Sequence, residues 1–169
     1  MEIDVHFRIR SGSGPRAEVY PMADESYIRG LTSAIKDRIE IANASTRREN
    51  REAEIRRSEA PRVWVNLKLW LAQAVGQVNK EFGSQMPLTY REDLDEVGLR
   101  FRVGSNAADL TIHFNDLLGT ITAKGDHFSM SFTPAVDGNK LYYVVDSGMN
   151  QPVTIEEIGQ RIISAVVKP

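Results

Sequence analysis

The sequence predicts an α+β fold in which long N-terminal helices precede a five-stranded antiparallel meander and a C-terminal helix packed on the sheet. The prediction rests on the spacing of apolar residues along the chain. They recur at helical intervals from Asp24 to Phe82, alternate every second residue from Val97 to Val145, and return to helical intervals after Thr154. A parallel sheet built from βαβ units would interleave the two periods, so their separation along the chain favours α+β.

The composition is that of one globular domain, and it excludes several kinds of site. Of the 169 residues, 41% are hydrophobic and 26% are charged, with a net charge of -2. We therefore expect a single domain over residues 22–169 and no general attraction to nucleic acid. The chain contains no cysteine, which excludes disulfides and cysteine metal ligands.

The sequence shows neither a classical signal peptide in its first residues nor an uninterrupted apolar stretch long enough to cross a membrane. The first residues lack the basic and apolar regions of a classical signal peptide, and polar residues interrupt the most apolar stretch, 63–78. These patterns favour a soluble, cytoplasmic protein with no membrane partner.

Residues 1–21 form a separate segment. Apolar and polar residues alternate over 2–10, which is typical of a half-buried strand, and SGSGP, a flexible-linker composition, follows at 11–15. Two interpretations stay open: an extra strand that joins the sheet, or an extension without fixed structure. Met22 would also serve as a translation start.

The helical part, residues 24–83, begins with an amphipathic stretch capped by Asp24 or Ser26. Its apolar stripe consists of Ile28, Leu31, Ile35, Ile39 and Ala42. The run 47–62 that follows mixes arginine with glutamate, which predicts a solvated helix or helical arm. The interleaved glutamates would repel phosphates, so we do not expect the arginines to bind nucleic acid.

Pro61 should kink this helix or open a new one, because proline has no amide hydrogen to donate. The next apolar stripe lasts about five turns, up to Gly83, which favours a helix over the alternative of a strand at 63–69. Apolar residues surround much of this helix, so we expect it in the interior or between protomers. The predicted interface residues are Trp64, Leu67, Trp70 and Leu71.

An acidic connection at 83–96 leads into the predicted sheet, which spans residues 97–145. The five expected strands are 97–103, 108–114, 117–123, 128–132 and 140–145. Their short links predict sequential antiparallel pairing, with residues such as Val103, Leu110, Leu117, Ile121 and Met130 facing the core. A capping box, Thr154 to Glu157, predicts the C-terminal helix over 154–167.

No residue pattern indicates a catalytic site, a metal site or a cofactor. The histidines, His6, His113 and His127, are far apart, and the glycines form neither a dinucleotide-binding nor a phosphate-binding loop. The outward face of the predicted sheet is instead rich in hydroxyls and cations and poor in acidic residues. Such a surface can hold an anionic ligand through charge-assisted hydrogen bonds. The candidate ligand-binding residues are Arg100, Arg102, Thr111, His113, Thr122, Ser129, Ser131 and Tyr142.

Two functions are compatible with these observations. The first is a non-enzymatic protein-interaction module that forms a homo-oligomer, or binds a protein partner, through its apolar helix. The second is a small anionic-ligand-binding or catalytic α+β domain that uses the polar sheet face. The sequence predicts no cofactor and no metal, and it leaves open whether the protein is an enzyme.

Overall fold

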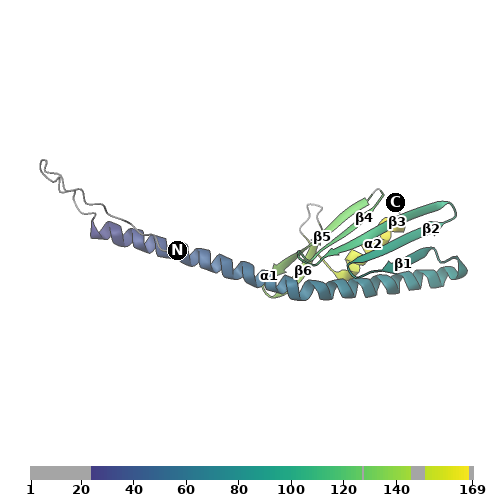
Figure 1. Ribbon diagram of the computed structural model, residues 1–169, viewed down its shortest axis with the longest axis horizontal. Helices are drawn as coiled ribbons and strands as arrows, with labels where there is room; N and C mark the ends of the chain where they lie inside the picture. The colour runs from purple at the N-terminus through teal and green to yellow at the C-terminus, as the bar shows by residue number, and fades with distance from the viewer. Residues whose placement is uncertain (1–23, 127, 146–150, 168–169) are drawn as a thin grey trace, which may run out of the picture. The chain divides into compact units, whose positions relative to one another are not determined.

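The structure, a computed structural model, describes residues 24–126, 128–145 and 151–167 (Figure 1). The predicted strand at 2–10 and the histidines His6 and His127 lie outside these residues. The chain divides into two compact units, Met1–Asn43 and Ala44–Pro169. Helix α1 (Glu25–Phe82) contributes residues to both units, and every residue described in the first unit is exposed.

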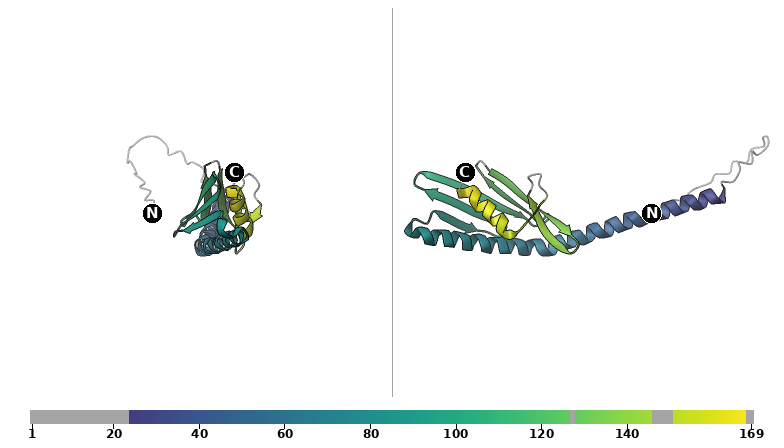
Figure 2. Two further views of the ribbon diagram at one scale, coloured as in Figure 1. Left: turned by 90° about the vertical axis from the view of Figure 1, so that its right-hand side faces the viewer. Right: turned by 180° about the vertical axis from the view of Figure 1, so that it is seen from behind.

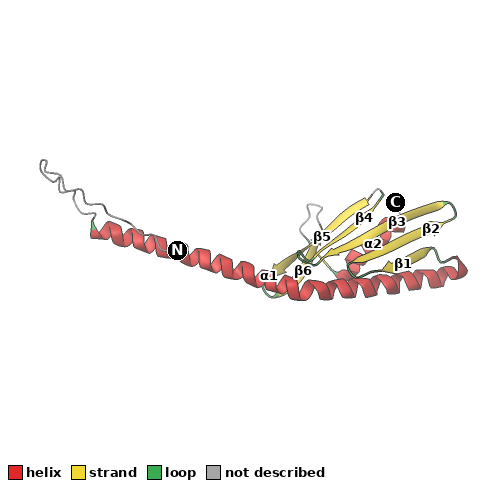
Figure 3. Cartoon of the chain, in the orientation of Figure 1, coloured by secondary structure: helices red, strands yellow, loops and turns green. Residues whose placement is uncertain are grey.

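The second unit is built on one sheet of seven antiparallel strands arranged in chain order (Figure 3). The α+β class and the antiparallel pairing are confirmed, but the number of strands is seven rather than five. The strands are β1 (Leu88–Glu92), β2 (Glu96–Val103), β3 (Asn106–Asn115), β4 (Thr120–Gly125), β5 (Phe128–Asp137), β6 (Lys140–Val145) and β7 (Pro152–Val153). The sequence analysis missed β1 and β7 because both are short and lie beside prolines and, for β1, an acidic stretch.

The predicted alternation of buried and exposed residues is present in the strands. In β3, Leu110, Ile112 and Phe114 are buried, whereas Thr111 and His113 between them are exposed. One face of the sheet is therefore apolar and the other is wet, as expected for an antiparallel sheet covered on one side.

Two residues expected in the core are exposed. Val103, at the end of β2, is 52% exposed, and Leu117 is 90% exposed. Leu117 lies in the turn before β4, which begins at Thr120 instead of residue 117. Alternation alone does not mark where a strand ends, and both errors lie at such ends.

Helix α1 continues through Pro61, so no new helix opens there. A proline inside a helix removes one amide donor and is normally costly. Packing on both sides of the proline offsets this cost, because Ala60 and Trp64 are buried, with exposed fractions of 1% and 4%. The helix ends at Phe82, where Gly83 takes the left-handed φ of 61° that favours glycine after a helix.

One hydrophobic core joins residues 60–75 of α1, the inner face of the sheet and α2 (Ile155–Val167). Figure 2 shows α2, in yellow, against one face of the sheet. Trp64 of α1 stacks on Phe114 of β3, with ring centroids 5.5 Å apart and planes at 9°. Among the described residues, neither α1 nor α2 combines the length and hydrophobicity needed to cross a membrane.

The predicted capping box at the start of α2 is present. The Thr154 amide donates to Glu157 Oε2 at 2.7 Å, and the Glu157 amide donates to Thr154 Oγ1 at 3.2 Å. These two bonds satisfy amides that the first turn of a helix leaves without partners. They fix the start of α2 beside Pro152 and Val153 of β7.

Candidate functional sites

The outward sheet face brings together some of the predicted ligand-binding residues. Cross-strand register places Thr111 opposite Gly98 and Lys124, with Ser129 next in the same row. His113, Thr122 and Ser131 form the neighbouring row. Hydroxyl groups of β3, β4 and β5 therefore share one surface.

Arg102 and Tyr142 do not join this cluster. Arg102 lies opposite Ala107 near the end of β2, and Tyr142 lies on β6 opposite Ala135. Both positions are several residues from the row that contains Thr111. The sequence predicted that both residues lie on the outward face of the sheet. It did not predict which residues lie next to them on the neighbouring strands, because the turns set the strand register.

The same face carries more negative charge than the sequence suggested. Arg100 donates to both carboxylate oxygens of Asp109, at 2.5 and 3.1 Å. The hydrogen bond from Arg100 lowers the pKa of Asp109, so this carboxylate stays charged. Glu96, expected in a connection, begins β2 and lies opposite His113. The prediction of a face poor in acidic residues is therefore wrong in this region.

A hollow of about 440 Å³ lies over Gly98 on the outward face. Its lining includes Thr89, Arg91, Asp93, Glu96 and Thr111. Both signs of charge are present, so the hollow as a whole does not select an anion. Its cations are Arg91, on β1, and Arg100, which is paired with Asp109.

A second candidate site is an apolar helix face within the first unit. The apolar stripe of α1, defined as Ile28, Leu31, Ile35 and Ile39, is exposed by 49–54% at each position. Asp24 caps the helix, since its Oδ1 accepts from the Ser26 amide at 3.0 Å, and this bond lowers the pKa of Asp24. The cap confirms one of the two residues that the sequence offered for that role.

Three of the four predicted interface residues have a different role in the structure. Trp64, Leu67 and Leu71 are buried in the core of their own chain, and Trp70 is half-buried. A Cβ atom built on Gly159 of α2 would lie 2.2 Å from the Trp70 ring, so Trp70 packs directly on α2. Apolar residues surround much of this part of α1 because it contacts both the sheet and α2.

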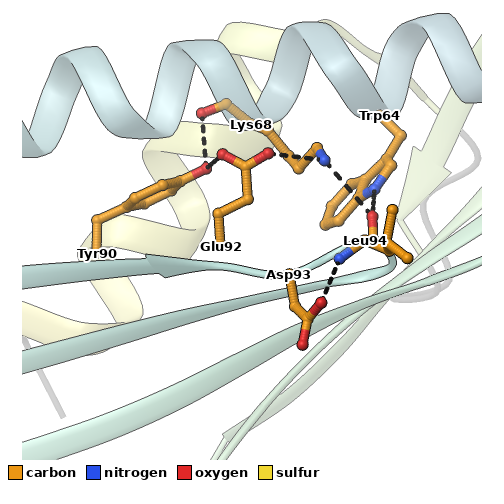
Figure 4. Close-up of polar contacts among 6 residues, drawn as sticks. All are labelled: Trp64, Lys68, Tyr90, Glu92, Asp93 and Leu94. Carbon is orange, nitrogen blue, oxygen red and sulfur yellow. Dashed lines mark hydrogen bonds and ion pairs between the residues drawn. The ribbon is translucent and has the colours of Figure 1, made fainter.

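A polar network that the sequence analysis did not find joins α1 to β1 (Figure 4). Lys68 forms an ion pair with Glu92 at 2.8 Å, and the Tyr90 hydroxyl donates to Glu92 Oε2 at 2.9 Å. Trp64 Nε1 donates to the Leu94 carbonyl at 3.2 Å. Figure 4 shows these side chains between the helix and the strand, in an arrangement that holds the two elements together.

The network also shifts two pKa values. Hydrogen bonds from Lys68 and Tyr90 lower the pKa of Glu92, whereas burial and the neighbouring Glu92 raise the pKa of Tyr90. Tyr90 is therefore a neutral donor and Glu92 a charged acceptor near neutral pH. Neither group is prepared to exchange a proton there, so the network is better suited to structure than to acid–base catalysis.

The arginine-rich part of α1 makes many of its contacts along the helix. Glu52 accepts from Arg48 at 2.9 Å and from Arg56 at 3.2 Å, and Arg62 pairs with Glu59. These are the i,i+3 and i,i+4 pairs typical of an exposed helix surface. They reduce the positive charge available for phosphate groups.

The described residues contain no cluster of three or more His, Asp or Glu side chains arranged to hold a metal ion. Comparison with known proteins found no match among family models, curated proteins or solved structures. The candidate sites therefore have to be interpreted from their own geometry.

Proposed function

We propose that this protein is a non-enzymatic interaction module that self-associates through the apolar stripe of α1. The observation that carries the proposal is the exposure of this stripe, in which four aliphatic side chains on one helix face are about half accessible. Contiguous exposed apolar surface of this kind is typical of interaction sites. Tyr27, four residues before Leu31, extends the apolar surface beside the stripe, with an exposed fraction of 66%.

Energetics favour a weak pair of helices. Burying a half-exposed aliphatic side chain contributes roughly 1 kcal/mol, so the eight stripe residues of two copies contribute roughly 8 kcal/mol. Association costs about 4–15 kcal/mol in translational and rotational freedom. At the lower end of that cost about 4 kcal/mol is left, which corresponds to a reversible complex with a Kd of about 1 mM.

The stripe is self-complementary in an antiparallel pair of identical helices. With the two-fold axis between Leu31 and Ile35, Leu31 of one copy faces Ile35 of the other, as in an isologous interface. A second copy of this chain is the partner that we propose.

Sedimentation velocity over about 10 µM to 1 mM tests the proposal. The wild-type protein should show a concentration-dependent shift from monomer to dimer, and Leu31→Glu should remain monomeric because it buries a charge in the stripe. Ser33→Glu is the matched control. Successive helix residues turn by about 100°, so residue 33 lies on the opposite face and its substitution should leave association unchanged.

Two results would contradict self-association through the stripe. One is a wild-type protein that stays monomeric over the whole concentration range. The other is a Leu31→Glu variant that associates as strongly as Ser33→Glu, since the interface would then lie elsewhere.

A second candidate function is binding of a small anion on the polar sheet face. The observation in its favour is the row in which Thr111 and Ser129 flank Lys124, with no ion pair to Lys124 among the described residues. Inorganic phosphate should then raise the melting temperature, and Lys124→Gln should remove the shift. Lys140→Gln, at the far end of the sheet, is the control, and equal shifts in both variants would contradict this function.

A further inference from the structure

A separate concave surface lies on the inner side of the sheet. A cavity of about 930 Å³ opens between α2 and strands β3, β4 and β5. Its floor includes Leu110, Phe128 and Met130, and its helix side includes Gln160, Arg161 and Ser164. The volume falls within the range of roughly 300–1,000 Å³ that is typical of small-molecule sites.

A glycine lies in the floor of the cavity. Register places Gly125 between Leu110 of β3 and Phe128 of β5, on the inward face. A Cβ atom at this position would lie 2.9 Å from the Asp109 carbonyl oxygen, so a larger residue does not fit without movement. The close approach of the β3 backbone is the physical reason for glycine at this position.

The floor is apolar and incompletely covered. Leu110 is buried, whereas Phe128 and Met130 are only half-buried, although both pack against the core. Apolar surface that is both concave and accessible favours a hydrocarbon ligand. Methionine adds an adaptable wall for a flexible chain.

In the part of the chain that the structure describes, the rim of the cavity carries one cation, Arg161, on α2. Of the carboxylates at the rim, Asp109 is paired with Arg100, and Glu157 accepts from the Thr154 amide. Arg161 is exposed and makes no ion pair with any described residue. Asp126 also borders the cavity, but it lies on the turn after β4. The guanidinium of Arg161 is thus the cation that can bind a carboxylate in a bidentate manner.

We propose that this cavity binds an amphiphilic monocarboxylate, with its hydrocarbon chain on the Phe128–Met130 floor and its carboxylate at Arg161. The site is independent of self-association through α1, because it uses only residues of the second unit. A medium-chain fatty acid has the required combination of one apolar chain and one anionic head.

Isothermal titration with decanoate, below the concentration at which it forms micelles, tests the proposal. The wild-type protein should bind decanoate saturably with a stoichiometry of one per chain. Decanol and decyltrimethylammonium should bind about tenfold or more weakly, because neither supplies an anion to Arg161.

Two variants separate the head-group and chain contacts. Arg161→Gln should weaken decanoate binding about tenfold and leave the affinity for decanol unchanged. Ser164→Phe, at an exposed position of the rim, should block both ligands without lowering the melting temperature. Arg91→Gln, which removes the same charge from the outward sheet face, should bind decanoate like the wild type.

Binding to the apolar stripe of α1 would mimic a cavity site, and Leu31→Glu distinguishes the two. This variant should lose self-association but retain decanoate binding in full. The proposal is overturned if wild-type protein shows no saturable binding, if Arg161→Gln binds decanoate unchanged, or if Leu31→Glu abolishes binding.

Discussion

At the scale of single residues, the contact between α1 and α2 depends on the absence of one side chain. Gly159 lies against Trp70, and a Cβ atom there would be 2.2 Å from the indole ring. Gly159 lies within α2, and glycine inside a helix costs more conformational entropy on folding than alanine does. Close helix packing is the physical reason for glycine at this position.

Gly159→Ala should lower the free energy of unfolding by about 1–3 kcal/mol, because the added methyl group overpacks the contact with Trp70. Gly76→Ala is the matched control within α1. No heavy atom lies within 4 Å of its Cβ position, so alanine should raise stability by about 0.5–1 kcal/mol. Urea denaturation of both variants measures the difference, and equal effects in the two variants would contradict the packing argument.

The alternation of residue types in the sequence predicted which face of the sheet a side chain lies on, but it did not predict which residue lies opposite on the neighbouring strand. The alternation of Leu110 and Thr111 predicted correctly which side chain is buried. The pairing of Arg100 with Asp109, and the position of Glu96 opposite His113, depend on strand register. Register is set by turn geometry and by the starting residue of each strand, which alternation does not specify.

At the scale of elements, α1 shields one edge of the sheet. The Leu88 amide donates to Asn79 Oδ1 at 3.1 Å, and Asn79 Nδ2 donates to the Leu88 carbonyl at 2.7 Å. The side-chain amide thus pairs with β1 as a neighbouring strand would. Exposed edge strands promote pairing between chains, so a covering helix limits aggregation at β1.

Asn79→Ala should lower the free energy of unfolding by about 1–3 kcal/mol, since it leaves the buried Leu88 amide and carbonyl without partners. Amide exchange at Leu88 should accelerate for the same reason. Gln77→Ala changes an exposed residue two positions earlier and should have little effect. Unchanged exchange at Leu88 in Asn79→Ala would show that the edge is protected in another way.

Sequence periodicity predicted the long elements and failed for the short ones. The change from helical to alternating spacing located the boundary between α1 and the sheet, and the Thr154–Glu157 pattern located α2. Strands β1 and β7 escaped detection because five and two residues are too few to establish a period. Pro61 suggested a break in α1, but tertiary packing on both sides of it prevails over local preference.

At the scale of the whole molecule, the hydrophobic core and the proposed association surface lie in different parts of the chain. Every residue of the hydrophobic core lies between Ala60 and Val166, and every residue described in 24–43 is exposed. The cavity beside α2 also belongs to the second unit. Sequence reasoning did not find this cavity, because it arises from the packing of α2 against three strands that are distant in sequence.

A chain that begins at residue 44 should keep the stability of the second unit while losing self-association. Its free energy of unfolding should differ from that of the full-length chain by no more than about 0.5 kcal/mol, since no core residue is removed. Thermal denaturation and sedimentation velocity measure the two properties on the same samples. A large loss of stability would show that residues 1–43 support the fold.

The chain-order arrangement of the sheet also bears on how the protein is synthesised. Each strand finds its partner immediately after it in the sequence, so hairpins can form successively with a low contact order, which favours rapid folding. Helix α2 is the last described element, however, and it covers apolar surface that every preceding strand has helped to create. That surface is bare on the nascent chain until α2 has been synthesised, which makes the docking of α2 the step at which chaperones have the most to protect.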